Sequence, residues 1–191
     1  MTLQTTVADH FALRWRASSW LYDLTLILSG SLFIALCAQI AVPLPFSLVP
    51  ITGQTFAVLL VGALYGSRRG AATIVAYLAE GACGLPFFAE GSSGMIALLG
   101  PTGGYLLGFV AAAYLTGWLA ERGWDRNVLS TTAAMVLGNA AIYIIGLAWL
   151  SCFVGTDQVL ALGFYPFIPG AIVKITLAAM ILPTAWKFLK R

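Results

Sequence analysis

The stretch Leu24–Ser67, LTLILSGSLFIALCAQIAVPLPFSLVPITGQTFAVLLVGALYGS, contains 44 residues without one Asp, Glu, Lys or Arg. Because about 20 apolar residues suffice to cross the hydrocarbon core of a bilayer, this stretch is too long for one membrane helix. It is interrupted by Pro43, Pro45 and Pro50. Proline removes a helix hydrogen bond and disfavours helical geometry in the residue before it. The sequence therefore predicts two membrane helices joined by a proline-rich loop.

The composition of the whole chain agrees with a membrane protein. Of its 191 residues, 60% are hydrophobic and 9% are charged, whereas soluble domains average about 25% charged residues. The single histidine, His10, leaves no histidine-based metal or catalytic site, and no GxxxxGK(S/T) phosphate-binding loop occurs. A net charge of +3 without a basic face does not suit nucleic-acid binding. We therefore expect an integral protein of the lipid bilayer without a metal site.

Six apolar segments follow one another along the chain. We expect membrane helices over residues 21–40, 54–65, 69–82, 105–120, 128–153 and 167–186. The second and third are short for a span, so the alternative is five spans, with these two helices as a re-entrant pair. Between the third and fourth lies Gly84–Gly104, with six glycines and two prolines. A long segment of this kind inside a compact domain is usually functional or disordered.

The ten Lys and Arg residues determine the predicted orientation. With six helices and a cytoplasmic N-terminus, nine of the ten fall on the cytoplasmic side: Arg14, Arg16, Arg68, Arg69, Arg122, Arg126, Lys187, Lys190 and Arg191. The outer loops carry Glu90 and Asp157 and no cation. Because cytoplasmic loops are enriched in Lys and Arg, we expect an all-α membrane protein with six transmembrane helices and both termini in the cytoplasm. Residues 1–20 would form a cytoplasmic segment and residues 21–191 the membrane domain.

The tenth cation, Lys174, lies near the outer end of the last predicted helix. A lysine inside a membrane helix costs about 2.5 to 3.5 kcal/mol on insertion scales, so it normally faces a cavity, a partner or the interface. It either extends its amine to the outer headgroups or lines an outward-facing pocket suited to an anionic ligand. Other polar side chains are expected at the same level: Thr52, Gln54, Glu80, Asn139 and Tyr143. Asn139 either joins two helices by hydrogen bonding or contacts the ligand.

Small residues form one face of the first predicted helix: Gly30, Ser31, Ala35 and Ala38. Such faces allow close helix contact in lipid, where dispersion forces rather than hydrophobicity drive association. This face either packs within the bundle or contacts another membrane subunit.

Four segments of the chain have the order and spacing of a known family. They are Val49–Leu60 (VPITGQTFAVLL), Gly84–Ala89 (GLPFFA), Leu99–Phe109 (LGPTGGYLLGF), and Pro166–Gly170 (PFIPG) followed by Lys174. In these segments the chain resembles the BioY family, the biotin-specific substrate-binding (S) components of energy-coupling factor (ECF) transporters. The resemblance extends from about Leu21 to the C-terminus.

The resemblance implies a six-helix module in the plasma membrane of a prokaryote that captures biotin, the transported ligand, at its outer face. It also implies two kinds of partner, a transmembrane coupling subunit that meets the small-residue face of the first helix and two cytosolic ATPases. The chain itself would then be no enzyme in its own right and would hold no cofactor. The loops after the first, third and fifth helices would cover the ligand. We expect Phe88, Tyr105, Gly103 and Gly104 to contact the apolar part of biotin. The alternatives are an S component for another vitamin and a membrane subunit without a ligand.

The polar ends of biotin are expected to meet Lys174 and Asn139, but one position departs from the family pattern. The family usually has an acidic residue three positions before the lysine, and this chain has Ala171 there. Lys174 therefore lacks a counter-ion on its own helix face. Either Glu80 or Asp157 supplies the acid from another segment, or Lys174 contacts the ligand directly.

Overall fold

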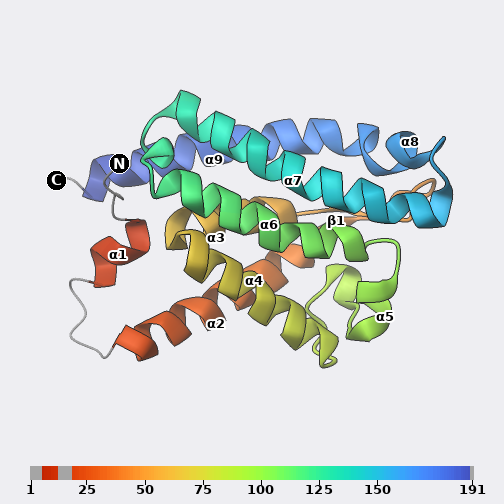
Figure 1. The fold of residues 1–191 in the computed structure, drawn as a ribbon, viewed down its shortest axis with the longest axis horizontal. Helices are drawn as coiled ribbons and strands as arrows, with labels where there is room; N and C mark the ends of the chain where they lie inside the picture. Colours follow the sequence, from red (N-terminus) through yellow and green to blue (C-terminus); the bar gives the residue numbers. More distant parts are fainter. Residues whose placement is uncertain (1–5, 13–18, 190–191) are drawn as a thin grey trace.

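Six helices of 12 residues or more form a bundle in the computed structural model, which describes residues 6–12 and 19–189 (Figure 1). They are α2 (Ser19–Ala38), α3 (Gln54–Tyr65), α4 (Ser67–Ala82), α6 (Gly103–Ala120), α7 (Val128–Val154) and α9 (Ile168–Leu189). Their positions agree with the six predicted segments, and their ends differ from the prediction by a few residues. The prediction of an all-α fold is confirmed.

Four helices in the described part of the chain are long and apolar enough to cross a membrane: α2, α6, α7 and α9. By contrast, α3 has 12 residues, and α4 has 16 and carries Arg68 and Arg69. At 1.5 Å per residue, α3 is about 18 Å long and α4 about 24 Å, less than the roughly 30 Å of hydrocarbon. The structure thus contains four clear candidate spans, which is fewer than the six predicted.

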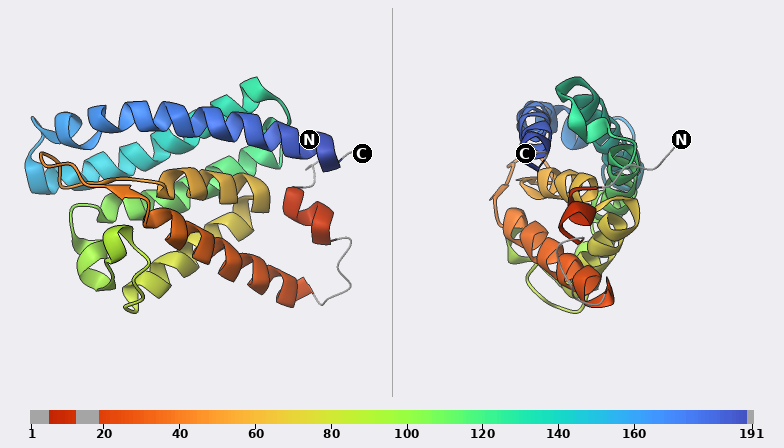
Figure 2. Two further views of the ribbon diagram at one scale, coloured as in Figure 1. Left: turned by 180° about the vertical axis from the view of Figure 1, so that it is seen from behind. Right: turned by 90° about the vertical axis from the view of Figure 1, so that its left-hand side faces the viewer.

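Shorter elements cap the two ends of the bundle (Figures 1 and 2). At one end, α1 (Val7–Ala12) lies near the C-terminal end of α9, and the 3-10 turn η2 (Trp124–Arg126) joins α6 to α7. The opposite end holds the antiparallel strands β1 (Ala41–Val42) and β2 (Ile51–Thr52), η1 (Ala89–Gly91), α5 (Gly94–Leu99), α8 (Val159–Gly163) and η3 (Tyr165–Phe167). The glycine-rich segment 84–104 therefore contains two short helical elements.

Apart from Lys174, the described Lys and Arg residues lie at one end of the bundle. The described cations other than Lys174 belong to turns and termini at the α1 end: Arg68, Arg69, Arg122, Arg126 and Lys187. Glu90 in η1 and Asp157 before α8 belong to the opposite end. The remaining predicted cytoplasmic cations lie outside the described residues: Arg14, Arg16, Lys190 and Arg191.

The small-residue face of α2 points into the bundle. All four of its members are buried: Gly30, Ser31, Ala35 and Ala38. A Cβ atom at Gly30 would lie 2.7 Å from the Thr73 side chain of α4 and 2.8 Å from the Tyr65 ring of α3, and the Ser31 hydroxyl donates a hydrogen bond to Glu80 of α4. This face packs against the chain's own helices, as the alternative of packing within the bundle predicts.

Candidate functional site

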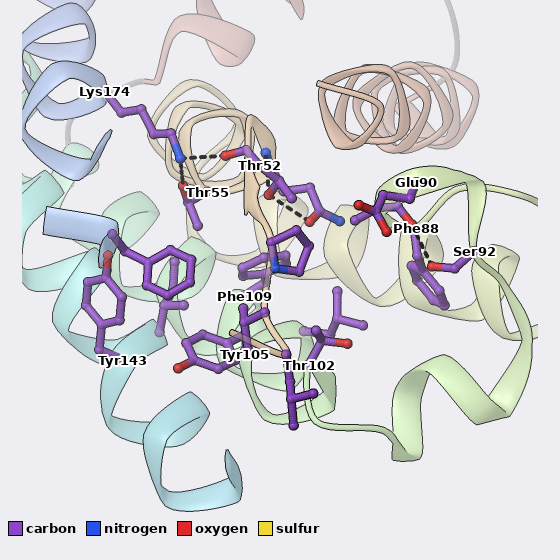
Figure 3. Close-up of a pocket in the computed structure, with 18 residues that line it drawn as sticks. Thr52, Thr55, Phe88, Glu90, Ser92, Thr102, Tyr105, Phe109, Tyr143 and Lys174 are labelled. Atoms are coloured by element: carbon purple, nitrogen blue, oxygen red, sulfur yellow. Dashed lines mark hydrogen bonds between the residues drawn. The ribbon is translucent and has the colours of Figure 1, made fainter. Parts of the chain in front are cut away.

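A cavity of about 200 Å³ lies at the end of the bundle opposite α1 (Figure 3). Its walls come from the segment before β2, the first turn of α3, the η1 segment, and α6, α7 and α9. Nine lining residues carry polar side chains: Thr52, Gln54, Thr55, Glu90, Ser92, Thr102, Tyr105, Tyr143 and Lys174. Most of the remaining wall is aromatic or aliphatic and includes Phe88, Phe109 and Phe167. Small-molecule sites commonly have this composition, with a few polar groups in an apolar enclosure.

Lys174 reaches the cavity from α9 and is half-buried. Its Nζ atom donates to the backbone carbonyl of Thr52 at 2.5 Å and to Oγ1 of Thr55 at 2.8 Å. Within the described part of the chain, no carboxylate forms an ion pair with it. The position three residues earlier, Ala171, does not line the cavity. The ammonium group is therefore a positive charge in a largely apolar enclosure, held by uncharged oxygens.

The two carboxylates considered as its counter-ion lie elsewhere. Glu80 accepts the hydrogen bond from Ser31 between α4 and α2, and Asp157 is exposed in the turn before α8. Glu90 does line the cavity, on the other side from Lys174 (Figure 3). Its backbone has a φ of 58°, which is uncommon for a residue other than glycine and recurs at functional sites.

Aromatic residues form the apolar wall and fasten the surrounding elements. The Tyr105 hydroxyl of α6 donates to the carbonyl of Gly163 at 2.8 Å, which ties α6 to α8. The Tyr143 ring meets Phe164 edge to face, with ring centroids 5.1 Å apart. Phe88 is 2% exposed and presents its ring to the cavity from the η1 segment. These rings offer rigid apolar surfaces for a ligand.

Helix termini add to the positive potential of the cavity. Thr52, Gln54 and Thr55 lie at the start of α3, and Thr102 immediately precedes α6. The first backbone N–H groups of a helix lack intrahelical partners and carry partial positive charge, so an anion is favoured there. Lys174 and these two helix ends favour a negatively charged group of a ligand on their side of the cavity, whereas the Glu90 carboxylate lines the other side.

Six of the ten binding residues predicted from the sequence line the cavity: Thr52, Gln54, Phe88, Tyr105, Tyr143 and Lys174. Four do not line it: Glu80, Gly103, Gly104 and Asn139. The Asn139 side chain donates to the carbonyl of Met135 one turn earlier in α7, at 3.0 Å. A Cβ atom at Gly104 would overlap Trp149 of α7, so this glycine permits the close contact of α6 with α7.

Sequence reasoning missed several lining residues. Phe109 lies four residues after Tyr105 on α6, so the helical repeat could have placed it on the same face. Thr55 follows Gln54 in the first turn of α3 and was open to the same reasoning. Glu90 and Ser92 had no such signal, because they lie in a segment without regular periodicity whose path depends on its neighbours.

Comparison with known proteins agrees with this fold. The BioY family model matches residues 6–191. The biotin transporter BioY2 of Lactococcus lactis subsp. cremoris is 38% identical over 165 residues, covering 84% of this chain and 87% of that protein. The biotin transporter BioY of Rhodobacter capsulatus is 38% identical over 177 residues, covering 85% and 92%.

One solved structure has the same fold over almost the whole chain. The crystal structure of the S-component for biotin from an ECF-type ABC transporter superposes with a TM-score of 0.80 at 26% sequence identity. The alignment covers 90% of this chain and 95% of that one. The family match, the full-length relatives and the shared fold together show that the chain belongs to the BioY family.

Proposed function

We propose that this chain is the biotin-binding S component of an ECF-type importer and that it captures extracellular biotin in the cavity beside Lys174. One observation carries the proposal: the Lys174 ammonium group, which forms no ion pair with any described residue, faces a cavity with aromatic walls. Relatives of similar length are biotin transporters. Biotin carries a carboxylate, an apolar ring with an alkyl chain, and a hydrogen-bonding ureido group, which match the three kinds of surface in the cavity.

The carboxylate of biotin would bind Lys174. A charge-assisted hydrogen bond is roughly twice as strong as a neutral one, and a ligand carboxylate supplies the charge that Ala171 does not. The ring and alkyl chain would lie against Phe88, Tyr105 and Phe109. The ureido group would reach the side of the cavity that carries Glu90, whose carboxylate can accept hydrogen bonds from the ureido N–H groups.

The cavity would face the outside of a prokaryotic plasma membrane. Five described cations belong to the opposite end of the bundle, and cytoplasmic loops are enriched in Lys and Arg. In this orientation all six helices of the membrane domain 21–191 traverse the bilayer, residues 1–20 form a cytoplasmic segment, and both termini lie in the cytoplasm. Loops at the cavity end, including β1 and β2, would cover the bound ligand.

Transport itself would require partners. An S component supplies selectivity, whereas a transmembrane coupling subunit and two cytosolic ATPases would supply the movement and the energy. The chain has no phosphate-binding loop of its own, and its family is that of a transporter rather than an enzyme. The coupling subunit would have to use a surface other than the buried small-residue face of α2.

Calorimetric titration of the purified chain in detergent with biotin tests the proposal directly. We expect saturable binding with one biotin per chain, and no saturable binding at micromolar biotin would show the proposal to be wrong. Competition with riboflavin and thiamine tests the alternative that the chain binds another vitamin. Displacement of biotin by either compound would support that alternative.

Replacement of the cavity lysine locates the site. Lys174→Gln should weaken biotin binding by a factor of about 10 to 100, because a hydrogen bond to a charged group contributes about 1.5 to 3 kcal/mol. Lys187→Gln, at the exposed far end of α9, is the matched control and should bind like the wild type. Equal affinities for the two variants would place biotin elsewhere.

A further inference from the structure

A chain of hydrogen bonds connects Lys174 to the opposite wall of the cavity through a residue that does not line it. Lys174 donates to the carbonyl of Thr52, and the Thr52 hydroxyl donates to Oε1 of Gln54 at 3.0 Å. Nε2 of Gln54 donates to the Tyr77 hydroxyl at 2.5 Å, and that hydroxyl donates to the carbonyl of Phe87 at 3.0 Å. The chain runs from α9 through β2 and α3 to α4 and then to the segment before η1.

Tyr77 is the central member of this chain. Its side chain is fully buried, with 0% exposure, and it is not among the residues that line the cavity. Its hydroxyl both accepts and donates, so it satisfies the Gln54 amide and the Phe87 carbonyl together. Its ring meets Phe88 edge to face, with centroids 5.6 Å apart and planes at 79°.

Hydrogen bonds and close packing hold Phe88 in place. Its backbone carbonyl accepts a hydrogen bond from Nε2 of Gln39 at 3.3 Å, and its N–H donates to the carbonyl of Ser92 at 3.1 Å. Gly81 lies one turn after Tyr77 on α4, and a Cβ atom there would overlap the Phe88 ring. The segment containing Phe88 is a glycine-rich loop, so the position of this wall depends on α4 and α2.

We propose that Tyr77 is a positioning residue for the biotin site: it makes no contact with the ligand and fixes Phe88 against the cavity through the Phe87 carbonyl and the edge-to-face ring contact. This inference rests on the proposed function and extends it to a residue behind the wall. A wall fixed before the ligand arrives lowers the entropy lost on binding. Loss of the hydroxyl leaves the buried Gln54 amide and the partly buried Phe87 carbonyl without their partner, which favours a displaced loop.

A double-mutant cycle in biotin affinity tests the inference. Tyr77→Phe keeps the ring and removes the hydroxyl, and it should raise the Kd for biotin by about tenfold. In a Phe88→Ala background the same change should raise the Kd by no more than about twofold, because the residue through which Tyr77 acts is gone. Tyr114→Phe, an exposed tyrosine of α6, is the control and should leave the Kd unchanged in both backgrounds.

A steric pair provides a second, independent measurement that does not require the Tyr77 variant to fold. Gly81→Ala should weaken biotin binding because its methyl group overlaps the Phe88 ring, whereas Gly81→Ala with Phe88→Ala should bind like Phe88→Ala alone. Equal loss of affinity from Tyr77→Phe in both backgrounds, or no rescue of Gly81→Ala, would overturn the positioning role. Absence of biotin binding by the wild type would instead refute the proposed function.

Discussion

Lys174 is the residue on which the proposed binding chemistry depends most. Its α9 neighbour three positions back is Ala171, and its present hydrogen bonds go to a carbonyl and a hydroxyl. A buried cation that exchanges neutral oxygens for a carboxylate recovers part of its desolvation cost. The ammonium group should therefore discriminate strongly between an anionic ligand and a neutral analogue.

A neutral biotin analogue tests that discrimination. The wild type should bind biotin carboxamide about tenfold or more weakly than biotin, because the amide offers no charge to Lys174. The Lys174→Gln variant should bind the two ligands within about twofold of each other. Titration calorimetry of both proteins with both ligands measures the coupling free energy between Lys174 and the ligand carboxylate. A similar preference for biotin in both proteins would contradict a contact between the carboxylate and Lys174.

The surroundings of Asp125 predict how the stability of the protein depends on pH. Asp125 lies in η2, is 2% exposed, and accepts a hydrogen bond from Nε1 of Trp186 in α9 at 2.5 Å. Burial raises the pKa of this carboxyl above its ordinary value, although the Trp186 hydrogen bond and the nearby Arg126 act in the opposite direction. Because the neutral acid is favoured in the folded state, its contribution to stability falls as the pH rises through this pKa.

Asp125→Asn should therefore be at least as stable as the wild type at pH 7, with a smaller loss of stability between acidic and neutral pH. Asp125→Ala leaves the buried Trp186 N–H without an acceptor and should cost about 1 to 3 kcal/mol. Thermal unfolding in detergent at several pH values measures both effects. The prediction would be wrong if Asp125→Asn lost stability on going to neutral pH and the wild type did not.

At the scale of elements, α3 is in close contact with α4 and α6 at glycine residues, which have no side chain to keep the helices apart. A Cβ atom at Gly62 of α3 would lie 2.6 Å from the Ala113 carbonyl oxygen of α6, and one at Gly70 of α4 would lie 2.9 Å from Cα of Gly62. These contacts involve backbone atoms, which cannot move aside as a side chain can. Close backbone approach of this kind supplies packing energy in lipid.

Gly62→Ala should therefore destabilise the bundle by about 1 to 3 kcal/mol, the usual cost of overpacking. Gly170→Ala in α9 is the matched control, because its nearest neighbour lies 3.7 Å away at ordinary van der Waals distance. Thermal unfolding of the purified variants compares the two. Equal melting temperatures would show that the helices separate at little cost.

Helix α1 is held to the bundle by charge. Thr6 and Asp9 form a reciprocal capping pair, with Thr6 Oγ1 donating to Asp9 at 2.8 Å. Arg69 of α4 pairs with Asp9 at 2.5 Å and with Asp23 of α2 at 2.8 Å, and the Tyr22 hydroxyl donates to the carbonyl of Ala8 at 2.7 Å. Burial alone would raise the pKa of Asp9, but hydrogen bonds from Thr6 and Arg69 hold it below its ordinary value of 3.8.

The sign of this shift predicts how α1 responds to acid. A carboxyl with a lowered pKa stabilises the docked helix at pH values above 3.8 and loses that contribution as the pH falls through its own pKa. Asp9→Asn should reproduce the acid effect at neutral pH, as faster amide exchange in α1, while the exposed Asp157→Asn should not. Hydrogen-exchange mass spectrometry, corrected for the pH dependence of the intrinsic exchange rate, measures this effect. Equal exchange rates of α1 in the wild type and in Asp9→Asn would contradict the prediction.

At the scale of the whole molecule, the cavity lies at the end of the bundle where the short helix α3 begins. The β1–β2 segment and the cavity occupy the end of the bundle from which α3 begins. At the other end, Glu121 of the α6–α7 turn accepts hydrogen bonds from the Ser67 N–H and hydroxyl at the start of α4. The α3–α4 turn thus reaches the level of the α6–α7 turn, which supports six crossings over a re-entrant pair.

Cysteine labelling decides between the two topologies. In a background without the three native cysteines, Arg68→Cys should react with a membrane-impermeant maleimide from the cytoplasmic side only, and Asp157→Cys from the outside only. Both native side chains are exposed, so low reactivity would not arise from burial inside the chain. A Cys at position 68 that is protected from both sides would indicate a re-entrant pair.

The helix positions were predictable from the sequence because long apolar runs and proline breaks are local signals. The unequal distribution of charge and the unusual lysine were also readable, since each depends on the cost of burying a charge in lipid. The glycine-rich segment 84–104 was recognised as important, but its path was not predictable. Its geometry comes from partners outside the segment, such as Tyr77 on α4 and Gln39 just after α2.

The sequence by itself determined that the chain is a membrane protein, where its six longer helices lie, and that Lys174 stands apart from the other cations. Whether Lys174 lines a pocket or extends to the headgroups was decided by the tertiary structure, which places it in the cavity wall. Only the tertiary structure decided which helix faces meet. It turned the small-residue face of α2 inward, kept Asn139 out of the cavity, and brought Glu90 and Phe109 into it. The physical reason is that α6 and α7 are apolar on nearly every side, so hydrophobic periodicity cannot distinguish a lipid-facing surface from a packed one. The rotation of each helix is set instead by glycine contacts and cross-helix hydrogen bonds.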